Sequence, residues 1–515
     1  MHKVYCTARM VALLGSILII IASIGLAEVK MYTGVGTCVL GDLGTPEQAK
    51  NLAKEKAMQN AKEQAGVFLA SYSRATNTHL SDNEISAITN NIINLVGEVK
   101  YQQTPGEVNG QPAIVYTATI QANIDTDGIK EWLMRDGKSK ETIVRQNEEV
   151  QNSIRSNINE LDQLTQQYDK AGSQQEKEMI RREFNDADKK LLASQKLEAG
   201  NVLYYKGDYD GAIRLWNEAL AINPEYAVAY SNRGVAYGDK GDYDRAIADY
   251  SQALAIDPKY ADAYNNRGVA YYNKGNYDRA IADFTQALAI DPKYAIAYNN
   301  RGNAYDDKGD YNRAIADYSQ ALTINPKLAE AYNNRGTIYY ESGYYDHAIA
   351  DFTQALAINP KLAQAYYNRG NAYDDKGEYD RAIADYSQAL AINPESALAY
   401  LSRGIAYADK DDYDRAIVDF TQALTINPKL AQAYLNRGVA FSHKGDYDRA
   451  IANYNQALAI DPKYANVYYN RGNAYYNKGI YDKAIANWRM YLEFYPDDED
   501  AKRNIQIAER EMRGR

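Results

Sequence analysis

The chain has 515 residues, with 58 basic and 68 acidic side chains, so its formal net charge is −10. This acidic balance argues against nucleic acid as a partner, because phosphate binding needs a concentrated basic face. Two cysteines exclude a disulfide scaffold, and four scattered histidines argue against a histidine-rich metal site.

The N-terminus has the pattern of an export signal. Lys3 and Arg9 give it a basic start, residues 10–26 form an apolar run, and small residues end that run. We predict a signal peptide over residues 1–27. The alternative is an uncleaved membrane anchor, because the run is near the lower length limit for a membrane span. In both cases we expect export to the periplasm, the cell envelope or the medium, with membrane contact only through this segment.

Residues 28–136 predict a small α+β domain. Its helices are indicated by Pro46 at a first turn and by Ser81 and Glu84 at capping-box spacing. The expected elements are a strand at 29–40, a helix from Pro46, a second helix from Ser81 to Leu95, strands at 96–101 and 113–122, and a short closing helix at 125–135.

This order resembles the N-terminal domain of the flagellar assembly protein T family and related small envelope lipoprotein domains of bacteria. The residues that carry the resemblance are Gly34, Gly36, the Ala-Lys-rich stretch 49–65, and the segments 97–99 and 115–120. The resemblance implies a non-enzymatic envelope domain, and it does not imply flagella.

Residues 137–192 predict a helical spacer with a break at 171–173. An apolar stripe recurs near a 3.5-residue period, at Ile143, Val150, Ile154, Ile158, Leu161, Leu164 and Tyr168. Two interpretations remain: a short coiled-coil dimer, or a spacer that packs on its own chain. The second is favoured, because few heptads are present.

Nine repeats of 34 residues fill positions 193–498. Every repeat has Gly at position 8, Ala at position 20, an aromatic residue at position 24 and Pro at position 32. The prolines are Pro224, Pro258, Pro292, Pro326, Pro360, Pro394, Pro428, Pro462 and Pro496. The small residues allow two helices to cross closely, and the proline stops the second helix. Each repeat is then a helix pair that buries its apolar face by stacking on its neighbours.

These positions closely resemble the tetratricopeptide repeat (TPR) pattern. The resemblance implies a mostly α fold: a right-handed superhelical solenoid with a concave inner face built from the first helix of each repeat. The small α+β domain and the helical spacer precede it. Residues 499–515, which are charged and mostly of helical pattern, suit a C-terminal capping helix.

Two repeat positions depart from the family pattern. Position 7 is Arg instead of a large apolar residue, and position 23 is Asp in six repeats, as in Arg369 and Asp385. We favour an Arg–Asp pair within the stack, and the alternative is a row of arginines that binds a ligand. From the second to the seventh repeat, positions 23–25 alternate between Asp-Tyr-Ser and Asp-Phe-Thr, which indicates duplication of a 68-residue pair.

In the family, positions 2, 5, 9, 12 and 13 of the first helix face the groove. The predicted partner-binding residues there are Asp239, Asp262, Tyr272, Asn299, Asn303, Asp306, Asp307, Glu330, Asn333, Tyr340, Glu341, Tyr367, Asn371, Asp374, Asp375, Asp409 and Tyr476. Nine are acidic, and no Lys or Arg occupies these positions. We therefore expect a basic or polar protein or peptide partner, with a merely solvated acidic face as the alternative.

No catalytic triad, phosphate-binding glycine loop or metal-ligand cluster is present in the sequence, so we predict neither an enzyme nor a cofactor. The spacing of Asp306, Asp307 and Asp310 does not fit an EF-hand calcium loop. The predicted function is an exported scaffold that binds protein through its repeats. The alternative is a binder of cell-wall glycan or peptidoglycan, since Asn, Asp and Tyr also suit sugars.

Overall fold

The computed structural model describes residues 29–40, 44–75, 85, 89, 93–108, 111–125 and 137–513. The predicted signal at 1–27 lies outside these residues, and so does the predicted closing helix apart from Asp125, which ends a strand. The chain divides into two compact units, and the division falls between Lys308 and Gly309 in the sequence. We call them the N-terminal unit and the C-terminal unit.

The N-terminal unit begins with a three-stranded antiparallel sheet in the order β1-β3-β2. The strands are β1 (Val29–Leu40), β2 (Ile93–Val108) and β3 (Gln111–Asp125). The predicted helix end at Leu95 is wrong, because β2 already begins at Ile93. The periodicity of a short apolar run fits both a helix and a strand. Here the run pairs with β3, with Ile93 opposite Ile124, so it forms a strand.

Helix α1 (Pro46–Ala75) packs very closely on β1. A Cβ at Gly34 would lie 2.0 Å from the Ala57 carbonyl oxygen, and a Cβ at Gly36 would lie 2.2 Å from the Ala53 carbonyl oxygen. Only glycine fits at such a distance. The glycines of the strand and the alanines of the helix therefore form one contact.

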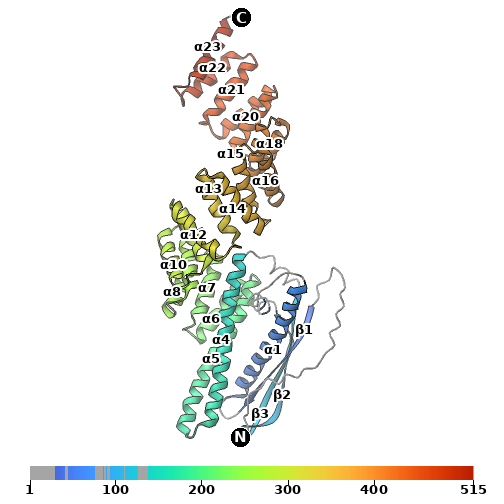
Figure 1. Ribbon diagram of the computed structural model, residues 1–515, viewed down its shortest axis with the longest axis vertical. Helices are drawn as coiled ribbons and strands as arrows, with labels where there is room; N and C mark the ends of the chain where they lie inside the picture. Colours follow the sequence, from blue (N-terminus) through green and yellow to red (C-terminus); the bar gives the residue numbers. More distant parts are fainter. Residues whose placement is uncertain are drawn as a thin grey trace. The chain divides into compact units, whose positions relative to one another are not determined.

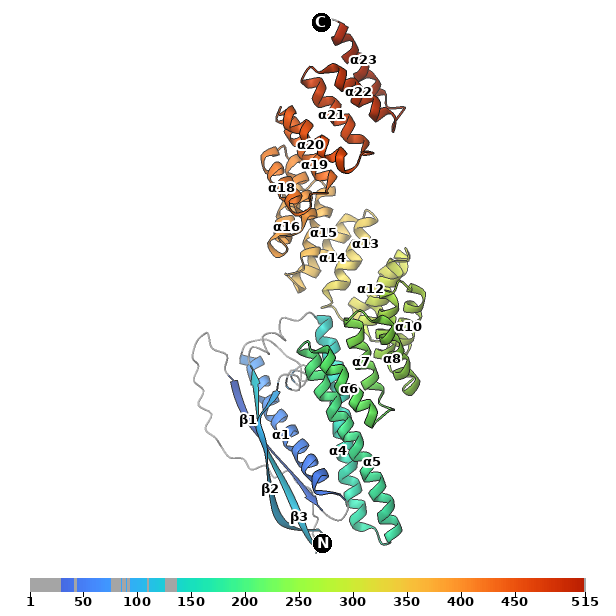
Figure 2. The same ribbon diagram turned by 180° about the vertical axis from the view of Figure 1, so that it is seen from behind.

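A helical hairpin follows, formed by α4 (Gly137–Lys170) and α5 (Gln174–Tyr205). From Val150 onward the predicted stripe, with Ile154 and Leu161 fully buried, packs inside the N-terminal unit against residues such as Leu191. In Figures 1 and 2, α1 lies between the sheet and this hairpin. The predicted boundary at 192 falls inside α5, because no helix-breaking residue separates the spacer from the first repeat.

The remaining helices are the paired helices of the repeats. In the N-terminal unit they are α6 (Tyr209–Ile222), α7 (Ala227–Asp239), α8 (Tyr243–Ile256), α9 (Ala261–Asn273), α10 (Tyr277–Ile290) and α11 (Ala295–Asp306). None of the helices among the described residues combines the length and the apolar character that a membrane span requires.

In the C-terminal unit they are α12 (Tyr311–Ile324), α13 (Ala329–Glu341), α14 (Tyr345–Ile358), α15 (Ala363–Asp375), α16 (Tyr379–Ile392), α17 (Ala397–Asp409), α18 (Tyr413–Ile426), α19 (Ala431–His443), α20 (Tyr447–Ile460), α21 (Ala465–Asn477) and α22 (Tyr481–Leu492). Helix α23 (Glu499–Arg513) packs on α22 and buries Ala501 and Ala508.

The crossing of the two helices in a repeat follows the predicted pattern. A Cβ at Gly404 would lie 2.6 Å from the ring of Phe420, which is itself fully buried. Glycine at position 15 ends the first helix in the left-handed region, for example at Gly377 with a φ of 74°. Asp411 takes that place in the seventh repeat, with a φ of 60°.

Candidate partner-binding face

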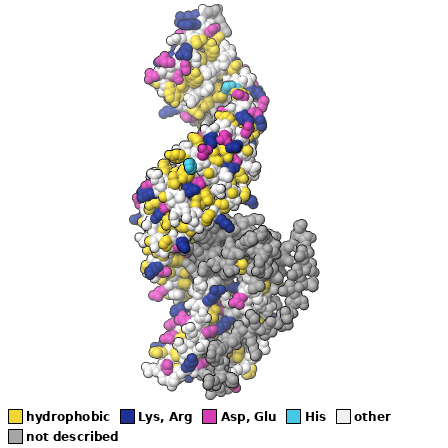
Figure 3. Space-filling model, viewed as in Figure 1, with side chains coloured by type: hydrophobic (Ala, Val, Ile, Leu, Met, Phe, Trp, Pro, Cys, Tyr) yellow, Lys and Arg dark blue, Asp and Glu magenta, His cyan; other side chains and the backbone are white. Residues whose placement is uncertain are grey.

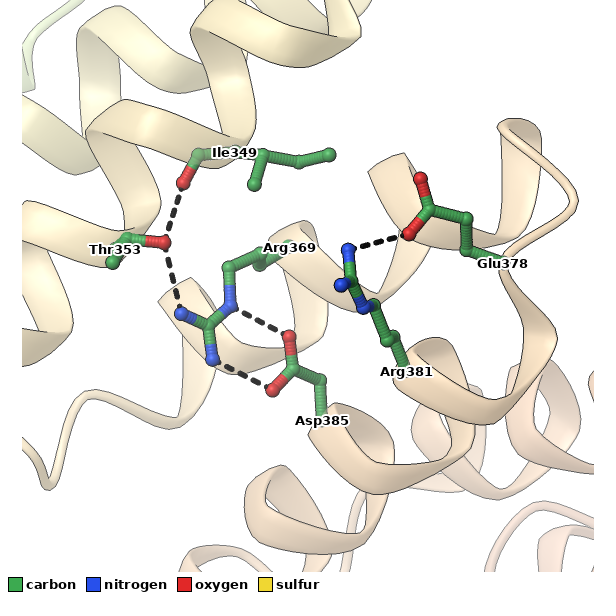
Figure 4. Close-up of polar contacts among 6 residues, drawn as sticks. All are labelled: Ile349, Thr353, Arg369, Glu378, Arg381 and Asp385. Atoms are coloured by element: carbon green, nitrogen blue, oxygen red, sulfur yellow. Dashed lines mark hydrogen bonds and ion pairs between the residues drawn. The ribbon is translucent and has the colours of Figure 1, made fainter.

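The arginines at position 7 are held inside the stack. Arg369 donates from Nε and Nη2 to the two carboxylate oxygens of Asp385, at 2.7 and 2.8 Å. Its Nη1 donates to the hydroxyl of Thr353 in the preceding repeat at 3.0 Å, as Figure 4 shows. The guanidinium also lies 5.7 Å from the ring of Tyr366. Hydrogen bonds to Asp385 raise the pKa of Arg369, although burial opposes this shift.

The same bidentate pair recurs through both units, in Arg233–Asp249, Arg267–Asp283, Arg335–Asp351 and Arg403–Asp419. In the last two repeats an asparagine replaces the aspartate, as in Arg437–Asn453. The predicted pair within the stack is therefore confirmed for these arginines. Their donors are engaged by the protein, so this row is a structural link between repeats.

A second row of ion pairs joins consecutive repeats at their loops. The lysine at position 14 contacts an aspartate at position 18 of the preceding repeat, as in Lys376–Asp346 at 2.6 Å. Asp346 is 84% exposed, so each such pair contributes little stability. On the face drawn in Figure 3, basic side chains accordingly lie beside acidic ones over the repeats. The charge of these second-helix acids is locally neutralised.

Three acids of the first-helix face, Asp239, Asp307 and Asp375, have tyrosines as partners. In the N-terminal unit the Tyr272 hydroxyl donates to Asp307 Oδ2 at 2.5 Å, and Tyr204 bonds Asp239 in the same way. In the C-terminal unit the Tyr340 hydroxyl bonds Asp375. These pairs recur every second repeat, so they follow the 68-residue duplication. Burial, and then the hydrogen bond to the carboxylate, raise the pKa of Tyr272 and Tyr340.

One group of predicted residues converges in the C-terminal unit. We call Asp374, Asp375, Asp409, Tyr340 and Tyr367 the acidic-tyrosine cluster. Burial raises the pKa of Asp374 to about 6, and the nearby charges of Asp409 and Asp375 add to the shift. The Oδ1 atom of Asp374 is buried without a hydrogen-bond partner.

Neighbouring polar groups hold the cluster in place. The ring centroids of Tyr367 and Tyr386 lie 5.8 Å apart, and the Tyr386 hydroxyl donates to Asn371 Oδ1 at 2.8 Å. The Tyr367 hydroxyl lies 3.3 Å from Ser402 Oγ on the next first helix. Asn371, a predicted site residue, therefore belongs to this neighbourhood.

The other predicted residues are more dispersed. Asp262 and Asn299 are buried, with 8% and 1% exposure, so they offer a partner little surface. Asn303, Asp306, Glu330 and Asn333 are half-buried, and Glu341 is exposed. Tyr476 packs 5.8 Å from the core ring of Trp488 near the end of the array.

The sequence prediction missed the apolar residues of the same face. Leu398 at position 2 is 55% exposed, and Ile405 and Val439 at position 9 are half-buried. The prediction considered only polar residues and tyrosines at the groove positions. The repeat register would have placed these aliphatic side chains equally well.

Within the described residues, no group of three or more His, Cys, Asp or Glu side chains is arranged to hold a metal ion.

The repeats match known family patterns. The TPR repeat matches residues 200–241, 236–275, 302–343, 336–377 and 441–479. The tetratricopeptide repeat matches 261–294, 363–396, 397–430 and 465–498, and a further match covers 284–316 and 420–452. The chain therefore belongs to the tetratricopeptide repeat family. Such repeats bind protein or peptide partners and generally serve as non-catalytic scaffolds, which is what this array indicates.

Several solved structures are similar to parts of the chain. A crystal structure of MamA is 33% identical and covers 32% of this chain and 96% of its own, with a TM-score of 0.30. YrrB, described as a TPR protein with an unusual peptide-binding site, is 27% identical over 36% and 95% of the two chains, with a TM-score of 0.31. Pseudomonas aeruginosa pilF is 22% identical over 40% and 94%, with a TM-score of 0.38. Comparison with curated proteins finds no match.

Proposed function

We propose that this chain is an exported, non-enzymatic scaffold whose first-helix face binds a basic or polar extended segment of a protein partner. The observation that carries the proposal is a contrast between two sets of acids. The aspartates of the second helices are paired with Lys or Arg, as Asp385 is with Arg369. Among the described residues, Asp374, Asp375 and Asp409 of the first-helix face have no such counterion.

Physical chemistry links this contrast to a cationic partner. Carboxylates without counterions, held near low-dielectric walls, focus a negative field that attracts positively charged groups. Tyrosine rings add contact area at a low entropy cost, and asparagine amides supply hydrogen bonds to an extended backbone. The export signal predicted at 1–27 supports a location outside the cytoplasm.

Site-specific photo-crosslinking in intact cells tests the binding face. A photoreactive amino acid at Leu398 should capture one defined polypeptide. The matched control is Val418, which is 66% exposed on the second helix of the same repeat, where no product is expected. If insoluble cell wall retains the protein, free sugar releases it and neither position captures a polypeptide, the chain binds glycan and the proposal is wrong.

Salt dependence tests the role of charge. Replacing Asp306, Asp307, Asp374 and Asp375 by Asn keeps the side-chain shape, and an Asn oxygen still accepts from Tyr272 or Tyr340. Association of the captured partner should become slower and less dependent on salt. The Debye length falls from about 10 Å at 0.1 M to about 3 Å at 1 M, so wild type should lose its advantage at high salt. Equal rates for both proteins at both salt concentrations would show that these acids only keep the array soluble.

A further inference from the structure

The first-helix face of the C-terminal unit changes chemistry along the array. The acidic-tyrosine cluster comes from positions 5, 12 and 13 of the first helices of the fifth, sixth and seventh repeats. At positions 2 and 9 the seventh repeat presents aliphatic side chains, and the eighth repeat presents Val439 at position 9. Position 2 changes from Gln364 to Leu398, and position 9 changes from Asn371 to Ile405.

The acidic half lacks a counterion within the described residues. Burial and the negative charges of Asp409 and Asp375 oppose ionisation of Asp374, and they raise its pKa to about 6. Its Oδ1 atom has no donor, although it is shielded from water. A bound ammonium or guanidinium would supply both the missing charge and the missing donor.

Aromatic rings border these carboxylates. Tyr340 and Tyr367 are half-buried, and both lie close enough to Tyr386 to raise the pKa of its hydroxyl. Tyrosine faces attract cations, and the array itself uses this contact, for example where Arg369 lies 5.7 Å from the ring of Tyr366. The cluster therefore suits the apolar stem of Lys or Arg as well as its charge.

The apolar half is anchored in the core of the next repeats. Leu398 exposes 55% of its surface, while Leu401 on the same helix and Leu435 on the next first helix are buried at 5% and 7%. Ile405 and Val439 are half-buried and pack against those core clusters. An aliphatic side chain of a partner would remove further apolar surface from water here.

We propose, on the basis of the proposed function, that this face binds one extended segment through two of its side chains. A Lys or Arg enters the acidic-tyrosine cluster, and a nearby aliphatic residue packs on Leu398 and Ile405. Leu398 and Asp409 are eleven residues apart on α17, about 16 Å along the helix, which an extended chain spans in about five residues. The recognised segment therefore carries its basic and aliphatic residues about five positions apart.

Synthetic 12-residue peptides and the full chain test this by fluorescence anisotropy. One peptide carries Lys and Leu five positions apart, and two others replace Lys by Gln or Leu by Ser. We expect the Lys/Leu peptide to bind at least tenfold more tightly than either control at low salt. Equal binding of all three peptides, or no binding of any, overturns the proposal.

Variants of the protein locate the two contacts. Asp374→Asn combined with Asp409→Asn should weaken the Lys/Leu peptide about tenfold and leave the Gln peptide unchanged, because only charge is removed. Leu398→Ser should weaken both peptides that contain Leu. One control is Asp380→Asn, which removes the acid of the exposed Lys410–Asp380 ion pair between repeats. The other control is Val418→Ser, on the second helix. Neither variant should change binding.

Failure of this inference can be told apart from failure of the proposed function. If the polypeptide captured at Leu398 binds both site variants as tightly as wild type, the two-contact inference is wrong and the scaffold function stands. If Leu398 captures no polypeptide, the proposed function itself is wrong.

Discussion

Arg369 binds both carboxylate oxygens of Asp385, at 2.7 and 2.8 Å, although Asp385 is only 8% exposed. Removing one partner of a buried ion pair is costly, because the charge of the other partner stays buried. The pair also reaches Thr353 in the repeat before it, so it couples neighbouring repeats. Removal of the arginine should therefore weaken more than one repeat.

We predict that Arg369→Leu destabilises the array by about 3 kcal/mol, because Asp385 loses its counterion. Asp385→Asn should cost only about 1 kcal/mol, since the Arg437–Asn453 pair shows that the protein accepts this arrangement at 2.8 Å. Urea unfolding of the two variants checks the order. Adding Asp385→Leu to Arg369→Leu should restore most of the loss, and a double variant no more stable than the single one would contradict the account.

The contact between β1 and α1 gives a second prediction. Gly36→Ala would put a Cβ 2.2 Å from the Ala53 carbonyl oxygen, so backbone must move. We expect a loss of about 3 kcal/mol, at the upper end of overpacking costs. Hydrogen exchange should rise in β1 and α1 first. Gly172→Ala is the control, because nothing lies within 4 Å of its new Cβ, and its exchange pattern should match wild type.

The seventh repeat offers a stabilising change. Asp411 is the one non-glycine residue with a positive φ among the described residues, and its sister repeats use glycine there. Asp411→Gly should stabilise by about 0.5–1 kcal/mol, because the left-handed conformation strains a side chain with a Cβ. The lost bond from the Tyr413 hydroxyl, at 2.6 Å, is exposed and worth little. The reverse change Gly445→Asp should lower the thermal midpoint, and a gain there would contradict the assignment.

The repeat architecture could be predicted because packing constraints recur at fixed positions. Gly404 and Phe420 illustrate a crossing that only a small residue and a flat ring satisfy, and the same pair of constraints appears nine times. The Arg–Asp pairs were also predictable, since both partners depart together from the family pattern. The link from Arg369 to Thr353 was not, because a hydroxyl on another repeat carries no distinctive signal.

Other differences have local causes. The spacer and the first repeat share one helix, α5. The sequence did not show where one ends and the other begins, because residues on both sides of 192 are good helix formers. The aliphatic residues of the proposed binding face, Leu398 and Ile405, were overlooked because aliphatic residues in a helix usually indicate core. Exposure, which the sequence does not state, separates the two cases.

The last prediction concerns the junction between α1 and α5. Glu55 is 7% exposed, and its Oε2 atom has no hydrogen-bond partner. Burial, and then the charge of Glu198, raise its pKa to about 7, although Lys62 and Lys54 oppose the shift. Lys62 is engaged by Glu198 in an ion pair, so it only partly compensates Glu55.

The sign of the pH effect follows from that direction. The folded state holds the Glu55 proton more tightly than the unfolded state, whose carboxyl ionises near its ordinary pKa of 4.5. The contribution to stability is therefore complete below about pH 4.5 and is lost as the pH rises toward 7. A shift of this size corresponds to a loss on the order of 3 kcal/mol.

Urea unfolding of the full chain at pH 5 and pH 8, followed by a probe in α1, should show this loss in wild type. Glu55→Gln should remove most of the difference between the two pH values, because an amide stays neutral. Glu63→Gln, an exposed change on the same helix, should leave it unchanged. If Glu55→Gln keeps the full pH dependence, another group at this junction titrates and the assignment to Glu55 is wrong.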